Sequence, residues 1–296
     1  MRLPPVSLET MLSEQNVDPQ NVPYSFVWTV VEQLSFENPF RKQYLDFLNN
    51  LGPRMYVNPL FEQISGEDSG AAIEAFFRLG KSRIFAQKLI GLTREDPDLA
   101  YRTFMNVEPD MPFTRELCYG LMYADVAGSV ESAIYGYGPD RFNPSLLVDL
   151  LGKSSTEGDL SASERAYSIL FSWGSYDRAI RSIVGGLSDP ISSDLCHDLL
   201  LDIGPSRVAS QYLVHALKDS RCVESAKCII LNYGPKFTAR HLAMAIDHPL
   251  KKDVIFEVFK SFGPDHYVIS ALDRASKFEG KGPLVAQIKH LYGIAA

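Results

Sequence analysis

The fold is decided by the stretch from Ile203 to Pro235, which reads IGPSRVASQYLVHALKDSRCVESAKCIILNYGP. It begins and ends with the same dipeptide, Gly204-Pro205 and Gly234-Pro235, and Gly263-Pro264 follows 29 residues later. Glycine accepts the left-handed conformation that closes a helix, and proline suits the first turn of the next helix. The dipeptide therefore predicts a joint at which one helix ends and another begins with almost no loop.

The joint recurs along the chain at intervals of about 30 residues, a period typical of helical solenoids and arrays. Outside this stretch the full dipeptide occurs again at Gly52-Pro53 and Gly138-Pro139, and weakened forms occur at Gly80, Glu108-Pro109 and Gly174. The sequence predicts an N-terminal arm or cap over residues 1–21, a single repeat domain over 22–293 and a tail over 294–296. Its nine units are expected to start near residues 22, 52, 80, 108, 138, 174, 204, 234 and 263.

The segment before each joint has the apolar pattern of a helix. Apolar or small residues stand one, four, five and eight positions before the glycines, and these offsets follow one face of an α-helix. The column four positions before the joint contains Leu48, Phe76, Phe104, Ile134, Leu170, Leu200, Ile230 and Phe259. The first half of each unit is also helical in pattern and ends in a turn such as Asp96-Pro97 or Ser188-Asp189-Pro190. We therefore expect an all-α fold, an α-solenoid of about nine helix-turn-helix repeats.

Helix pairs of this length with an Asp-Pro turn resemble HEAT-like repeats. The pattern is closest to the short repeats of phycobilisome lyases and deoxyhypusine hydroxylase, and it is clearest at residues 216–220 followed by residues 223–226. The resemblance covers residues 22–293, although the regular proline after the glycine departs from it. It implies that second helices line the concave side. It also implies several kinds of function: protein binding, bilin attachment by a lyase, di-iron chemistry, or DNA-glycosylase activity. The acidic balance and the presence of only two tryptophans, Trp28 and Trp173, argue against a DNA glycosylase.

The residues that metal or catalytic chemistry would need are not arranged for it in the sequence. No His-Glu dipeptide occurs, whereas the di-iron enzyme takes its ligands from such pairs. None of the six histidines lies three or four positions from another, and the four cysteines form no CxxC pair, so metal-ligand spacing is lacking. The sequence predicts no catalytic residue, no metal and no cofactor.

The composition and charge of the chain argue against some classes of binding partner. The net charge is −7 with a pI of about 5.4, which gives no overall electrostatic support for binding nucleic acid or anionic lipid. No segment approaches the roughly 18 apolar residues of a membrane span, and no signal peptide is recognisable at the N-terminus. Four cysteines without pair spacing indicate reduced thiols. We expect a cytoplasmic protein with a protein partner, and neither a nucleic acid nor a membrane partner.

The leading functional prediction is a non-catalytic scaffold or adaptor that binds a partner segment along its concave face. Aromatic columns three and seven positions before the glycines, with polar neighbours, form the candidate surface. Packing between repeats explains the same columns without any partner, so the more polar members are the better candidates. The alternative is a bilin lyase or chaperone-like enzyme that holds a tetrapyrrole in the groove. The partner-binding candidates are Tyr101, Arg102, Tyr135, Tyr167, His197 and Asp198.

Overall fold

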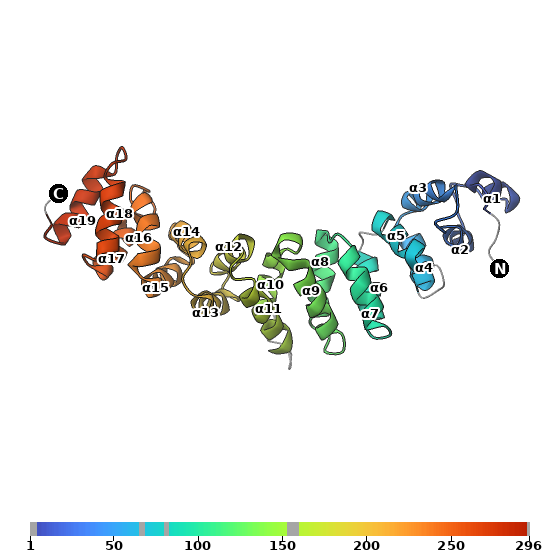
Figure 1. The fold of residues 1–296 in the computed structure, drawn as a ribbon, viewed down its shortest axis with the longest axis horizontal. Helices are drawn as coiled ribbons and strands as arrows, with labels where there is room; N and C mark the ends of the chain where they lie inside the picture. The colour runs from blue at the N-terminus through green and yellow to red at the C-terminus, as the bar shows by residue number, and fades with distance from the viewer. Residues whose placement is uncertain (1–4, 65–68, 80–82, 153–159, 295–296) are drawn as a thin grey trace. The chain divides into compact units, whose positions relative to one another are not determined.

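The computed structural model describes residues 5–64, 69–79, 83–152 and 160–294. Within these ranges the regular structure consists of nineteen α-helices and no strand, which confirms the predicted all-α class (Figure 1). No helix in the described ranges has the length and apolar character needed to cross a membrane. The joint expected at Gly80 and the long loop expected over residues 152–159 lie outside the described residues, apart from Gly152 itself.

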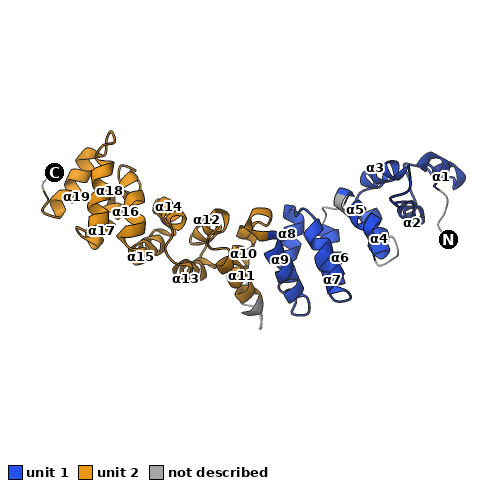
Figure 2. Ribbon diagram, viewed as in Figure 1, with its two compact units in different colours: residues 1–137 blue, residues 138–296 orange. Residues whose placement is uncertain are grey.

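The chain divides into two compact units, residues 1–137 and 138–296 (Figure 2). The first unit contains α1 (Leu8–Glu14), α2 (Tyr24–Glu32), α3 (Arg41–Leu51), α4 (Pro53–Ile64), α5 (Ser69–Leu79), α6 (Arg83–Leu92), α7 (Pro97–Asn106), α8 (Met111–Gly120) and most of α9 (Ala127–Arg141). The second contains α10 (Pro144–Leu151), α11 (Leu160–Ser172), α12 (Asp177–Gly186), α13 (Ser193–Ile203), α14 (Arg207–Ala216), α15 (Val223–Tyr233), α16 (Pro235–Met244), α17 (Lys252–Phe262), α18 (His266–Ala275) and α19 (Gly282–Leu291).

Consecutive helices pack as expected of a helical repeat. Each segment that starts near 22, 52, 80, 108, 138, 174, 204, 234 or 263 contains two helices, a first and a second. In the second unit the first helices α10, α12, α14, α16 and α18 contact one another in order, and so do the second helices α11, α13, α15, α17 and α19. This unit therefore has two layers. The contacts within its layer of first helices are the more extensive.

The buried core follows the predicted columns. The position four residues before the joint is fully buried wherever its side chain is described, except before Gly293, where Lys289 is only partly buried. The other described members of this column are Leu48, Phe104, Ile134, Leu170, Leu200, Ile230 and Phe259, each 0% exposed.

The glycine joints have a conformation that only glycine adopts readily. Gly52, Gly204, Gly234 and Gly263 have φ of 73° to 84°, but their ψ values lie near 180°. The sequence predicted the left-handed helical conformation, and this detail was wrong: the backbone is in the extended region at positive φ, which side chains with a Cβ avoid. Each glycine N–H still donates to the carbonyl four residues earlier, at 3.0–3.1 Å. The helix thus closes normally, and the chain then reverses direction.

Gly174 is a glycine for a different reason. It has no positive φ, but a Cβ placed on it would lie 2.6 Å from the side chain of Ile203. Close packing against the next joint, and not backbone conformation, requires glycine here. The repeated residue therefore has two distinct structural roles along the chain.

A tyrosine connects successive joints wherever one precedes the glycine. The hydroxyl of Tyr233 donates to the carbonyl of Leu200 at 2.6 Å, and this carbonyl also accepts the N–H of Gly204. Tyr292 makes the same bond to Phe259. In the first unit Tyr137 donates to the carbonyl of Phe104. Carbonyls in the last turn of a helix lack a full set of partners, so each hydroxyl completes a helix end in the preceding pair.

Replacing Gly234 by alanine tests the joint. We expect the free energy of unfolding to fall by about 1–3 kcal/mol, because a Cβ-bearing residue is strained at φ 75° and ψ 173°. The matched control is Gly185→Ala in α12, where the added Cβ meets no atom within 4 Å. That variant should gain about 0.4–1 kcal/mol by restricting the unfolded chain. Urea denaturation of the full chain measures both; equal losses in the two variants would contradict the joint.

Replacing Tyr233 by phenylalanine tests the tyrosine bond. The variant keeps the buried ring and loses the hydroxyl, so we expect a loss of about 1 kcal/mol in the free energy of unfolding. Tyr176→Phe is the control, since this side chain is 47% exposed. Its stability should change by less than about 0.5 kcal/mol. A Tyr233→Phe variant as stable as the parent would show that the bond contributes nothing.

Candidate functional site

The sequence-predicted candidates fall into two groups, one in each unit, and all lie in second helices. Their side chains are exposed or partly exposed, which agrees with either a binding surface or the margin of a packing interface. Tyr101 and Arg102 lie in α7, Tyr135 in α9, Tyr167 in α11, and His197 and Asp198 in α13.

In the first unit, Tyr101 and Tyr135 are about two-fifths exposed, at 40% and 39%. A Cβ on Gly136 would lie 3.3 Å from the Tyr101 hydroxyl and 2.5 Å from the sulfur of Met105. Glycine therefore lets α7 and α9 approach closely, with Tyr101 at the edge of their contact. The exposed Arg102 bonds within its own helix, its Nε donating to the carbonyl of Asp98 at 3.3 Å. These side chains are partly engaged in packing between repeats.

In the second unit, the hydroxyl of Tyr167 donates to Asp202 at 2.5 Å and joins α11 to α13. Burial and the neighbouring Asp202 raise the pKa of this phenol, so the hydroxyl remains a donor. His197 is half-buried and Asp198 is exposed. Tyr167 thus has a structural bond of its own, and none of these three residues lines the groove described next.

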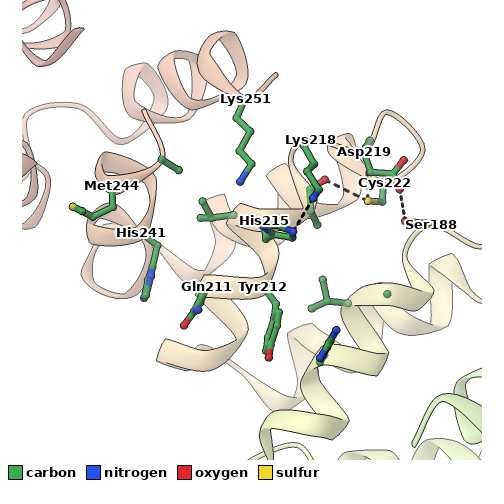
Figure 3. Close-up of a pocket in the computed structure, with 16 residues that line it drawn as sticks. Ser188, Gln211, Tyr212, His215, Lys218, Asp219, Cys222, His241, Met244 and Lys251 are labelled. Atoms are coloured by element: carbon green, nitrogen blue, oxygen red, sulfur yellow. Dashed lines mark hydrogen bonds between the residues drawn. The ribbon is translucent and has the colours of Figure 1, made fainter. Parts of the chain in front are cut away.

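A groove of about 610 Å³ opens in the second unit, on the layer of first helices (Figure 3). It crosses α12, α14 and α16 and the turns that follow each of them. The lining residues are Arg181, Val184, Gly185, Ser188, Gln211, Tyr212, Val214, His215, Ala216, Lys218, Asp219, Cys222, His241, Met244, Ala245 and Lys251. Three successive helix pairs each contribute one helix to this surface.

The groove combines an apolar floor with polar walls. Val184 and Val214 are nearly buried, at 6% and 3% exposed, whereas Met244 is 41% exposed. The hydroxyl of Tyr212 donates to Asp177 at 3.0 Å, which fixes the ring against α12. Gln211, one position earlier, is exposed and not fixed in this way. Such a surface offers both apolar contact and hydrogen bonding to a bound chain.

Three nitrogen-bearing side chains converge within the groove, between Met244 on one side and Ser188 on the other: His215, Lys218 and Lys251 (Figure 3). The Nζ atom of Lys218 lies 2.8 Å from Nε2 of His215. Lys251 is only 5% exposed, and Figure 3 shows its side chain directed towards His215. Within the described ranges, the Lys251 ammonium has no hydrogen-bond or ion-pair partner. A lysine with a buried stem therefore points its ammonium into the groove without a counter-ion.

The one carboxylate in the lining, Asp219, is already engaged. Arg221 donates to both its oxygens, from Nε at 3.1 Å and from Nη2 at 2.8 Å. The hydroxyl of Ser188 adds a bond of 3.1 Å to Oδ2. The Arg221 guanidinium in particular holds the pKa of Asp219 well below its usual range. Asp219 is thus charged and neutralised by Arg221, and the lysines keep their positive charge uncompensated.

The cations of the cluster repel one another. Partial burial lowers the pKa of His215, and Lys218, Lys251 and His248 lower it further. Burial also lowers the pKa of Lys251, with Lys218 as a second cause. A neutral His215 accepts a hydrogen bond from Lys218 through Nε2, which is the arrangement that the short distance requires. The cluster favours an anion and disfavours a further proton.

The helical columns of the sequence do not single out Lys251, because it lies just before a second helix and not within one. It stands twelve positions before Gly263, and the same position before Gly204, Gly234 and Gly293 is Ser192, Cys222 and Lys281. Each of these four residues precedes the first turn of a second helix and is less than 9% exposed. A lysine at a position that holds serine or cysteine in neighbouring helix pairs is the sequence signal that could have identified Lys251.

Comparison of the chain with protein-family models, curated protein sequences and solved structures gives no significant match. In the part of the chain that the structure describes, His, Cys, Asp and Glu side chains form no group of three or more suited to a metal ion. The interpretation of the groove therefore depends on its own geometry and charge.

The pKa of His215 tests the cluster. Nuclear magnetic resonance should give a pKa below the ordinary value of 6.5, and Lys251→Met should raise it by removing a nearby positive charge. Because the folded-state pKa is the lower one, the unfolded chain binds this proton more tightly. The contribution of His215 to the free energy of unfolding is therefore lost as pH falls through about 6.5 towards the folded pKa. An unchanged pKa in Lys251→Met would contradict the proximity of the two groups.

Proposed function

We propose that this chain is a non-catalytic scaffold, a HEAT-like α-solenoid that binds an extended segment of a partner protein. The observation that carries this proposal is the groove across α12, α14 and α16, which has an apolar floor and polar walls. This groove extends over three successive helix pairs. Surfaces formed by successive repeats suit extended partners, because each repeat contacts the next stretch of the bound chain. The proposed site lies on first helices and so differs from the second-helix surface predicted from sequence.

Similar hollows in the first unit support the choice of first helices. One of about 420 Å³ lies between Phe61 of α4 and α6, and another of about 490 Å³ lies between α6 and α8. In the second unit the first helices also contact one another more extensively than the second helices do. We therefore place the proposed binding surface on the first helices, whereas the resemblance implies a surface on the second helices.

A cytoplasmic location is proposed with this function. The four cysteines are free thiols, and Cys118, Cys196 and Cys222 are buried among apolar residues. Burial raises the pKa of Cys196 to about 12, so its thiol stays protonated and unreactive. Free thiols of this kind are usual in reducing compartments.

Selection of peptides from a random displayed library on the purified full chain tests the scaffold proposal. Gly185 lines the groove, and a Cβ on it meets no atom within 4 Å, so Gly185→Trp should fill the groove without disturbing the core. We expect this variant to bind the selected peptides at least about tenfold more weakly, because the indole occupies their site. Fluorescence anisotropy of labelled peptides measures the affinity.

Gly91→Trp is the matched control for this experiment. Gly91 stands at the same position of α6, eleven residues after its joint, and also has open space around it. Peptides that bind the groove of the second unit should bind this variant as they bind the parent. Equal binding to the parent and Gly185→Trp, or a loss confined to variants of Tyr101, Tyr135 and Tyr167, would return the site to the second helices.

The lyase-type alternative predicts a different ligand for the same groove, whose volume is in the range of small-molecule sites. Incubation of the purified chain with a bilin distinguishes the two functions by absorbance. The scaffold proposal expects an unchanged bilin spectrum. A saturable spectral change in the parent that disappears in Gly185→Trp would favour the alternative.

A further inference from the structure

Lys251 and Lys281 occupy the same position in successive repeats but have opposite surroundings. The ammonium of Lys281 donates to the carbonyl of Met244 at 2.7 Å and forms an ion pair with Asp247. Both acceptors belong to the preceding pair, at the end of its first helix and in the turn that follows. A lysine at this position can therefore be satisfied entirely within the protein.

For Lys251 the corresponding acceptors in the preceding pair are already used. The turn aspartate is Asp219, which Arg221 and Ser188 hold. The carbonyl at the end of the first helix belongs to Ala216, and it faces the thiol of Cys222 at 3.6 Å. Lys251 is consequently left with its stem buried and its ammonium directed into the groove.

An ammonium on a buried stem without a counter-ion is unfavourable, and a second cation beside it increases the cost. Lys218 lies close enough to lower the pKa of Lys251, and Arg181 also lines the groove. The chain as a whole carries a net charge of −7, so this concentration of positive charge is opposite in sign to the protein. Binding of an anion between the two lysines would compensate both.

We propose that Lys251, Lys218 and His215 form a carboxylate-binding subsite, and that the segment bound in the groove is acidic at this point. The inference rests on the proposed function, since it names the chemistry of the same partner. The groove extends beyond the cluster on both sides, onto α12 at Val184 and onto α16 at Met244, which suits a peptide chain more than an isolated anion. His248 lies close enough to lower the pKa of His215, His241 lines the groove on α16, and Asp219 remains paired with Arg221.

Binding of hexaglutamate, acetylated and amidated at its ends, tests the subsite by calorimetry and by the resonances of His215. The parent chain should bind it saturably and should not bind hexaglutamine of the same length. Because the net charge of the protein repels this peptide, binding reports a local cationic site. We expect about tenfold weaker binding in Lys251→Met, the loss of one close charge pair. Lys281→Met is the matched control and should keep the parent affinity.

Lys218→Met, at an exposed position, is a second variant that should weaken binding without a risk to folding. Absence of hexaglutamate binding, equal binding of hexaglutamine, or equal losses in Lys251→Met and Lys281→Met would each overturn the subsite. Titration with inorganic phosphate separates the two anion sources. Phosphate that binds at Lys251 where hexaglutamate does not would identify a small-anion site and overturn the acidic segment.

The outcomes for the subsite and for the scaffold are distinct. Library peptides that lack Asp and Glu but lose binding in Gly185→Trp would leave the scaffold intact and remove the carboxylate subsite. The opposite outcome is hexaglutamate binding that depends on Lys251, together with library peptides that bind Gly185→Trp as well as the parent. It would support the carboxylate subsite and would contradict the groove as the binding site of the scaffold.

Discussion

The organisation of the helix pairs depends on the backbone at the joint glycines. Positive φ combined with extended ψ at Gly204, Gly234 and Gly263 ends one helix and turns the chain so that the next helix starts within one to three residues. The glycine N–H completes the last turn of the helix, and a tyrosine hydroxyl from the next joint reaches the same carbonyl at Leu200 and Phe259. The carbonyl oxygens of Leu200 and Phe259 therefore each accept one hydrogen bond from their own helix end and one from the next helix pair. Spacing between pairs is set where the chain turns.

The groove is a consequence of that spacing. Because the joints place α12, α14 and α16 side by side, their surfaces form one continuous hollow. Cys222 and Lys251, which directly precede second helices, line this hollow. Serine and cysteine at this position bond within their own pair, through Ser192 and Cys222. Lysine is long enough to leave its pair. The lysine forms an internal ion pair where the preceding turn has an unpaired aspartate, and it faces the groove where that aspartate is already paired.

Much of the helical framework could be predicted because it depends on residue type and spacing alone. The column that includes Leu200 and Ile230 is buried as its spacing indicated. The ψ value at the joints could not be inferred, since glycine tolerates several conformations at positive φ. The role of Gly174 depends on Ile203, a contact between residues 29 positions apart. Lys251 and Lys281 are alike in sequence position, and they differ only because Arg221 engages the aspartate that Lys251 would otherwise meet. No local pattern carries that information.

We propose that the layer of first helices, and not the second helices, is the binding face of this chain. Hydrogen–deuterium exchange of the full chain, with and without a peptide selected from the library, tests it most directly. The claim predicts slower exchange in the peptide complex at the end of α14, at the end of α16 and in the turn that leads to Lys251. Slower exchange confined to α7, α9, α11 and α13, with no change around residues 211–222 and 241–251, would contradict it.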